Sequence, residues 1–309
     1  MSFDTDAWLE RRKLSRRLNW WRFIAVIALL AAGLGGLWWL DPGNVIGRRE
    51  DHVARLEIAG VIGENPWWAK KLKEAGDDPH VKAVIIYVNS PGGSTYGGEQ
   101  LYTNIRKLAA HKPVVAVIGT LGASAGYMTA IAADRVFARE TSLTGSIGVL
   151  FQTAEFSQLL GKLGVTAESI ASGPLKDQPS PIKPLSPEGR AELRRMVMET
   201  YDWFVGLVAE RRQLPRDTVL KLADGRVYTG RDALNQGLID QLGGMEEARA
   251  WLAESRAIPA GLPLRDIPPE PPAEGWRGMA SMAVSSLFGK SLFPERLRLD
   301  GLISLWHPE

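Results

Sequence analysis

Ser124 is the residue of this 309-residue chain whose surroundings most clearly suggest chemistry. It stands in the sequence GASAG (122–126), after an apolar, β-branched run at 114–118 and before a helical stretch. A serine at a strand-to-helix junction lies beside the free N–H groups of the helix start, which can stabilise an oxyanion. The spacing also fits the G-x-S-x-G nucleophile elbow. A structural serine that caps the helix is the alternative, and the motif alone leaves both open.

A serine nucleophile needs a base that takes its proton, and histidine is the usual one. The only histidine after Ser124 is His307, near the end of the chain and beyond a proline-rich stretch. This order does not suit the serine–acid–histidine order of an α/β-hydrolase. His52 and His111 precede Ser124, so a triad of another order stays open.

A neutral lysine can replace the histidine. Its amine must then have a pKa well below the usual value of about 10.4, through burial or a nearby cation. Lys176 and Lys183 are attractive candidates because they share a loop rich in proline and serine (171–187), which follows a glycine-flanked turn containing Ser146.

The composition argues against several other kinds of site. The chain has no cysteine, which excludes disulfides, thiol nucleophiles and zinc–thiolate sites. Its four histidines are scattered and form no H-E-x-x-H, so we expect no metal and no cofactor. Residues 1–22 carry six basic and three acidic side chains in a chain of net charge +2. The remainder is therefore close to neutral, which gives no electrostatic basis for binding nucleic acid.

The elements around Ser124 are expected to alternate between strands and helices, which predicts an α/β fold. Strands are expected at 53–62, 81–88 and 114–118, and helices at 67–75, 96–110 and 125–133. The last two strands are almost wholly apolar, as in a parallel sheet buried on both faces. A glycine-rich turn follows each of them, at the carboxyl ends where α/β proteins place their sites.

Later elements are a strand at 134–139, helices at 156–163, 188–213 and 245–255, and a short strand at 238–242. The chain thus divides into four regions. They are a basic N-terminus (1–22), a transmembrane anchor (23–40), a main domain (51–257), and a proline-rich linker with an apolar tail (258–309). For the tail, partial disorder and packing on a neighbouring subunit or a membrane both stay open.

The anchor is predicted from 18 uncharged residues at 23–40, which would form about 27 Å of helix. Tryptophan pairs at 20–21 and 38–39 flank the run, as in an aromatic belt. The basic cluster before it predicts a cytoplasmic N-terminus and an exported main domain. A cleaved signal peptide is the alternative, but the WWLDP sequence at 38–42 suits cleavage poorly.

Together, several segments resemble the bacterial signal peptide peptidase A family, in the short form with one catalytic domain. The segments that carry the resemblance are VIIYVNSPGG (84–93), GASAGY (122–127), SLTGSIG (142–148), SGPLKD (172–177), GRVYTG (225–230) and GLIDQLGG (237–244). The resemblance covers about residues 53–250. It implies a repeated ββα superhelix of the Clp-protease/crotonase type and a Ser–Lys peptidase anchored in the inner membrane, with its catalytic domain on the periplasmic side.

Carried over residue by residue, the resemblance makes Ser124 the nucleophile and Lys176 the general base, with Lys183 as the fallback. Ser146 would orient the lysine. The backbone N–H groups of Gly93 and Ala125 would form the oxyanion hole. The resemblance also implies a ring-like, octamer-like homo-oligomer with sites shared across subunits, and signal-peptide remnants as substrates.

Two other functions stay open at this point. A crotonase-like acyl-CoA enzyme would use the same paired N–H groups to stabilise an enolate, although an exported domain does not meet cytoplasmic CoA esters. A catalytically silent membrane scaffold would need neither nucleophile nor base.

Overall fold

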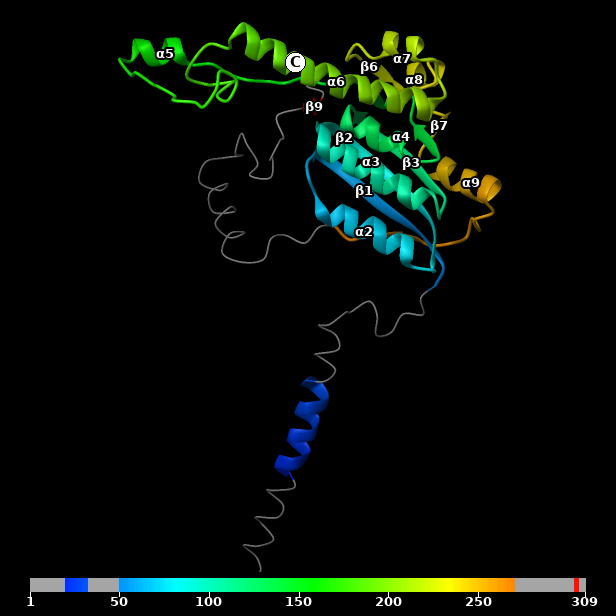
Figure 1. Ribbon diagram of the computed structural model, residues 1–309. Helices are drawn as coiled ribbons and strands as arrows, with labels where there is room; N and C mark the ends of the chain where they lie inside the picture. The colour runs from blue at the N-terminus through cyan, green and yellow to red at the C-terminus, as the bar shows by residue number, and fades with distance from the viewer. Residues whose placement is uncertain (1–19, 33–49, 270–302, 306–309) are drawn as a thin grey trace, which may run out of the picture. The chain divides into compact units, whose positions relative to one another are not determined.

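The computed structural model describes residues 20–32, 50–269 and 303–305 (Figure 1). The chain divides into two units, Met1–Glu50 and Asp51–Glu309. In the first unit, residues 20–32 are helical and their side chains are exposed. No helix in the described ranges is both long and apolar enough to cross a membrane. Residues 33–40 of the predicted anchor lie outside the described residues.

A mostly parallel sheet forms the centre of the second unit, as the sequence predicts (Figure 1). Within the described residues its main path runs β6-β5-β3-β2-β1-β8, and β4, β7 and β9 pair beside it. The strands are β1 (His52–Ile62), β2 (Val81–Ser94), β3 (Val114–Ala123), β4 (Arg135–Ala138), β5 (Leu143–Gly145), β6 (Val227–Thr229), β7 (Gln241–Leu242), β8 (Leu264–Asp266) and β9 (Ile303–Leu305). Among the strands that the structure describes, only the pairs β5–β6 and β2–β9 are antiparallel.

Alternate side chains of the central strands enter two different cores. In β2, Ile86 and Val88 pack with side chains of α2 (Pro66–Asp77), α3 (Thr95–Ala109) and α4 (Ala125–Ile131). Ile85 instead packs with Leu252 of α9 (Met245–Arg256) on the opposite face. The sheet is therefore buried on both faces, which confirms the interpretation of the apolar runs. The α/β fold is thus observed, whereas the repeated superhelix stays a prediction.

Two predicted turns are wrong in detail, because both belong to strands. The segment 89–94 continues β2, whose Gly92 and Gly93 pair with the end of β1. The segment 119–123 continues β3, where it pairs with β5. The strand β8 lies inside the stretch predicted to be a linker and pairs with residues 53–55 of β1. In each case pairing with a distant strand overrides the local turn signal.

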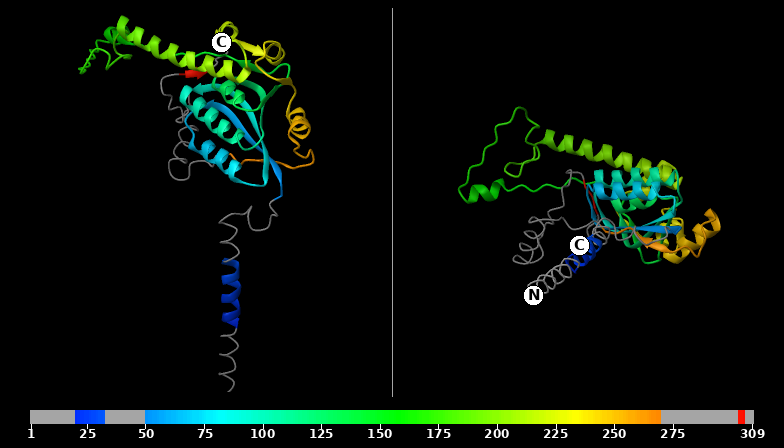
Figure 2. Two further views of the ribbon diagram at one scale, coloured as in Figure 1. Left: turned by 45° about the vertical axis from the view of Figure 1, so that its right-hand side comes forward. Right: turned by 90° about the horizontal axis from the view of Figure 1, so that it is seen from below.

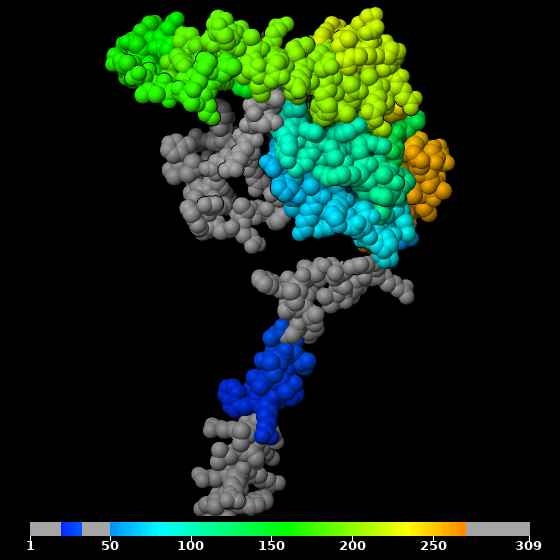
Figure 3. Space-filling view, in the orientation of Figure 1, coloured from blue at the N-terminus to red at the C-terminus, as the bar shows by residue number. Residues whose placement is uncertain are grey.

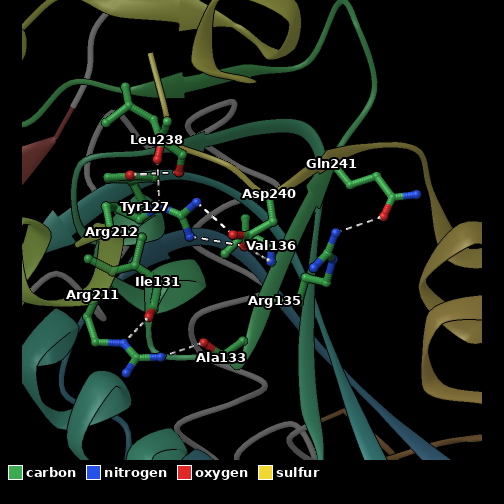
Figure 4. A network of polar contacts seen from close by, with 11 residues as sticks. Tyr127, Ile131, Ala133, Arg135, Val136, Arg211, Arg212, Leu238, Asp240 and Gln241 are labelled. Atoms are coloured by element: carbon green, nitrogen blue, oxygen red, sulfur yellow. Dashed lines mark hydrogen bonds and ion pairs between the residues drawn. The ribbon is translucent and has the colours of Figure 1, made fainter. Parts of the chain in front are cut away.

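The C-terminal end of α4 is fixed by arginine side chains of neighbouring helices. Arg211, near the end of α6 (Pro187–Arg212), donates to the carbonyls of Ile131 and Ala133 at 2.9 Å each (Figure 4). Arg106 of α3 donates to Ala132 O at 2.9 Å. Carbonyls at the end of a helix have no partner inside it, so these bonds stabilise α4 and hold it against the sheet.

A second part of this network holds the middle of α4. The Tyr127 hydroxyl donates to Leu238 O at 2.8 Å, and burial raises the pKa of that hydroxyl (Figure 4). Arg212 pairs with Asp240 at 2.8 Å. Asp240 also accepts a hydrogen bond from the backbone N–H of Val136 in β4. The helix that begins at the predicted nucleophile is therefore anchored along its length.

Residues 150–195 form an arm that projects from the sheet and its helices (Figures 1 and 2). The arm contains α5 (Ser157–Lys162), the segments flanking it and the first part of α6. The space-filling view shows it as a narrow extension of the domain (Figure 3). Several of its apolar side chains are exposed: Phe156 (51%), Leu159 (55%), Leu163 (68%) and Ile170 (95%). The predicted loop at 171–187 lies in this arm and contains no strand or α-helix before Pro187, which confirms its irregular structure.

Two further helices of the second unit are α7 (Arg216–Leu222) and α8 (Gly230–Asn235). They lie with β6 at the end of the domain from which α6 extends (Figure 1). Val219 of α7 and Ala233 of α8 are fully buried in the same core as α4.

Candidate functional site

Ser124 lies between β3 and α4 with an unusual backbone conformation, φ 57° and ψ −118°. Its side chain makes no capping hydrogen bond, although it occupies the N-cap position of α4. Helix capping, the structural alternative, therefore does not explain this serine. A positive φ at a non-glycine residue costs about 1–3 kcal/mol and persists only where the surroundings enforce it, often at functional sites.

Neighbouring elements hold this conformation in place. The Ser124 N–H donates to Gly145 O at 2.8 Å, and its carbonyl accepts from the Met128 N–H at 2.9 Å. One residue earlier, Ala123 pairs with Gly145 of β5. The absence of a side chain at Gly126 permits close approach to β2, since a Cβ there would lie 2.9 Å from Ser90 O. The strained serine is thus fixed from both sides.

Gly93 lies at the end of β2, the strand beside β3. The last pair of residues shared by these strands is Ser90 and Gly122. Gly93 follows Ser90 by three residues, and Ser124 follows Gly122 by two. Gly93 also pairs with Ile62 of β1, and a Cβ on it would lie 1.8 Å from the Ile62 carbonyl oxygen. Only glycine fits so close to that backbone. The structure therefore places the glycine-rich end of β2 beside the serine.

Ala125 is the first residue of α4, fully buried, and its N–H has no acceptor within the helix. The N–H groups of Ala125 and Gly93 come from two adjacent strand ends. That is the arrangement from which a two-donor oxyanion hole is built.

Ser146 follows β5 directly and also has a positive φ, 49°. It is 6% exposed, and its N–H donates to Arg226 O at 2.8 Å. β5 is held on β3 by the Thr144 hydroxyl, which donates to Gly122 O at 2.7 Å. Since Ser124 donates to Gly145, the residue before Ser146, the two serines lie on adjacent backbone segments.

Lys176 lies in the arm and is exposed. Among the described residues its side chain makes no hydrogen bond or ion pair, so one chain does not bring it into contact with Ser124. The alternative, Lys183, forms an ion pair with Asp177. The hydrogen bond from Lys183 lowers the pKa of the Asp177 carboxyl. The amine of Lys183 is therefore engaged, which makes it the poorer candidate for a base.

The histidine triads that the sequence left open do not fit the topology. His52 begins β1, and His111 lies just before β3, so both lie at the amino ends of parallel strands. Ser124 follows the carboxyl end of β3, whose ten residues span roughly 30 Å. Neither histidine can reach it, and His307 lies outside the described residues. No cluster of metal-ligating side chains occurs in the described parts of the chain.

Two features of this site are not apparent from the sequence. The arginines that hold α4 come from two other helices, α3 and α6. The strand β9 pairs with residues 92–94 of β2. The only sequence signal for β9 is the short apolar run at 302–306, which resembles any other part of the tail.

Comparisons with known proteins point to one family of peptidases. The sequence profile of peptidase family S49 matches residues 106–258. A Synechocystis protein, named as a proposed protease, is 36% identical to this chain over 203 residues. The match covers 65% of this chain and 73% of that protein. The chain belongs to peptidase family S49.

Two other relatives are covered less fully. A Methanocaldococcus jannaschii protein, also named as a proposed protease, is 40% identical over 182 residues, 59% of this chain and 58% of that protein. An Enterococcus faecium protein named as a proposed signal peptide peptidase is 36% identical over 226 residues, 69% of this chain and 66% of that protein. The match thus spans about three fifths to three quarters of these relatives. A ClpP1 mutant of Listeria monocytogenes aligns in structure with a TM-score of 0.43 and 16% identity, over 62% of this chain and 92% of that one.

Proposed function

We propose that this S49 peptidase is a serine endopeptidase with Ser124 as its nucleophile. The observation that carries the proposal is the conformation of Ser124. Its backbone is held at positive φ, and its hydroxyl makes no capping hydrogen bond to α4. Gly93 and Ser146 flank it from the adjacent strands. A structural serine would not need this combination, whereas a nucleophile elbow does.

In the proposed reaction, the Ser124 Oγ attacks the peptide carbonyl carbon while its proton passes to the neutral amine of Lys176. The N–H groups of Gly93 and Ala125 donate to the oxyanion that develops. The lysine then protonates the departing amine as the C–N bond breaks. A water molecule, deprotonated by the same lysine, then attacks the carbonyl carbon of the acyl-enzyme. The ester C–O bond to Ser124 breaks, and the lysine returns the proton to the Ser124 Oγ. Ser146 is a positioning residue that accepts a hydrogen bond from the lysine.

The lysine of each site is proposed to come from a second copy of the chain. Lys176 is exposed in an arm that also exposes large apolar side chains, a pattern typical of an interaction surface. An arm that reaches a neighbour makes a head-to-tail contact, which closes into a ring when the rotation allows. This supports the ring-like, octamer-like assembly that the family resemblance implies.

The substrates are proposed to be apolar peptides such as signal-peptide remnants. The name of the Enterococcus relative and the family resemblance support this choice. Anchoring of the chain in the cell membrane, with an extracytoplasmic catalytic domain, is proposed from the apolar run at 23–40 alone. Extraction of cell membranes at alkaline pH would test it, since an anchored chain stays in the pellet and a peripheral chain is released.

Complementation between two inactive variants tests the shared site. Ser124→Ala and Lys176→Ala are each expected to abolish cleavage of an apolar peptide. When subunits of the two variants are mixed and reassembled in equal amounts, about a quarter of the sites would combine an intact serine with an intact lysine. Recovery to about that level supports the proposal. Full activity of Ser124→Ala contradicts the proposed nucleophile, and no recovery in the mixture contradicts the shared site.

A further inference from the structure

The outer edge of β1 changes from paired to open part-way along the strand. β8 pairs with residues 53–55, and the last hydrogen bond of this pairing runs from the Ile267 N–H to Arg55 O at 2.8 Å. In a parallel pair the donors of one strand recur every two residues, so the next donor would be residue 269. That residue is a proline, which has no N–H. The pairing therefore stops, and β1 continues to Ile62 without β8.

The open part of this edge presents backbone groups that no neighbouring strand uses. Val53 and Arg55 bond toward β8. Because backbone groups alternate in direction along a strand, those of Glu57, Ala59 and Val61 face the same outer side. All three residues are exposed, and within the described residues none makes a backbone hydrogen bond on that side. An extended peptide can pair with such an edge as an added strand.

A groove of about 890 Å³ lies along this edge. Trp67 and Trp68, at the start of α2, line it and are partly buried against the main core. They give the groove an apolar side on which the side chains of an added strand can pack. A groove of this volume, with a few convergent polar groups, is typical of a binding site.

The charged side chains of the groove favour a basic ligand. Arg55 and Asp266 both line it and form an ion pair with each other at 2.6 Å. Glu57 and Glu64 line it as well, are exposed, and make no ion pair within the described part of the chain. Two carboxylates are therefore left to attract lysine or arginine side chains of a peptide paired with β1.

The groove lies close enough to Ser124 for one peptide to reach both. β1, β2 and β3 are parallel neighbours, and Ile62 at the end of β1 pairs with Gly93 of β2. Strands lie about 4.8 Å apart, so a strand added outside β1 is roughly 14 Å from the line of β3, which leads into Ser124. At about 3.3 Å per residue, an extended chain covers that distance in about five residues.

We propose that this groove is an exosite, a second binding site for the substrate of Ser124. The basic segment of a peptide adds to β1 as a strand, while the apolar segment lies at the serine. The inference rests on the proposed function, because it specifies the substrates of the same enzyme. Signal peptides have this composition, with a positively charged segment before an apolar one.

Two peptides that differ only in charge test the exosite. Both have the same apolar segment, preceded about five residues away by two lysines in one peptide and by two glutamines in the other. In the full chain the lysine peptide should have a KM about fivefold lower at equal kcat, because two exposed charge contacts contribute about two- to threefold each. Equal KM values for the two peptides would overturn the proposal, even with cleavage fully dependent on Ser124.

Variants of the two carboxylates locate the preference. The double variant Glu57→Gln/Glu64→Gln should cleave both peptides with the same KM. Glu254→Gln, which removes an exposed carboxylate of α9 outside the groove, should keep the fivefold difference. A double variant that keeps the preference, or that instead changes the oligomeric state in size-exclusion chromatography, would assign the groove to something other than the substrate and overturn the exosite.

A binding measurement separates this proposal from the catalytic one. In the Ser124→Ala background, which cannot cleave, a fluorescent lysine peptide should bind about fivefold more tightly than the glutamine peptide, and high salt should remove the difference. Ala59→Pro removes an N–H from the open edge only, so it should weaken the binding of both peptides. Equal affinity of the two peptides would overturn the exosite. If the chain with an intact Ser124 cleaves neither peptide, the proposed function fails, and the affinities still decide whether the groove binds basic peptides.

Discussion

Strain at Ser124 predicts that replacing this serine with glycine gives a more stable protein than replacing it with alanine. Ser124→Gly and Ser124→Ala both remove the hydroxyl, so they differ only in what the backbone tolerates at φ 57° and ψ −118°. Alanine keeps the strain of about 1–3 kcal/mol, whereas glycine adopts positive φ freely. Glycine loses about 0.5–1 kcal/mol more conformational entropy on folding. The net expectation is that Ser124→Gly is more stable than Ser124→Ala by about 1 kcal/mol.

Thermal and urea unfolding of both variants would measure this difference. For a domain of this size, about 1 kcal/mol corresponds to roughly 2–4 °C in Tm. Ser90 in β2 supplies the control, because it lies inside a strand and does not have a positive φ. There the order should invert, with Ser90→Gly less stable than Ser90→Ala. If Ser124→Ala were as stable as Ser124→Gly, the backbone would carry no strain and the reasoning from its conformation would be refuted.

Three further predictions concern the surroundings of the site. Gly93→Ala would force β2 away from β1, so kcat/KM should fall about 100-fold or more; an unchanged rate would exclude its N–H from the oxyanion hole. Arg211→Ala removes two hydrogen bonds to the end of α4 and should lower the free energy of unfolding by about 2 kcal/mol in urea, whereas Arg195→Ala on the exposed face of α6 should cost under about 0.5 kcal/mol. The ion pair from Lys183 lowers the pKa of Asp177, so its stabilisation is complete above the unfolded pKa of about 3.9 and is lost as pH falls through the lower folded value. Hydrogen exchange in residues 171–185, corrected for intrinsic rates, should rise over that acidic range in the wild type and stay high throughout in Asp177→Asn.

The sequence predicts the central strands and their helices well, because their signals are local. The apolar runs at 81–88 and 114–118 identify strands that are buried on both faces. In the structure, Ile85 and Ile86 pack in different cores, one on each face of the sheet. The serine motif marks the turn into α4 for the same reason. Strand, glycine and helix follow one another within a few residues.

What the sequence does not predict depends on contacts between distant segments. The glycine-rich end of β2 has the local signal of a turn, yet pairing with β1 continues the strand to Gly93. The short strands β8 and β9 exist only through their partners, so no periodicity reveals them. The place of Lys176 is of the same kind. Its loop is identified correctly, but a single chain leaves its side chain exposed.

The central claim is that Ser124 is the nucleophile of an S49 peptidase, and covalent labelling tests it most directly. The full chain would be treated with a fluorophosphonate and the modified residue located by mass spectrometry of its peptides. We predict one adduct, on Ser124, and its loss in Lys176→Ala, which retains the serine but lacks the proposed base. The neighbouring Ser146 should remain unmodified. Modification of another serine, or none on Ser124 in a chain that cleaves peptides, would contradict the account.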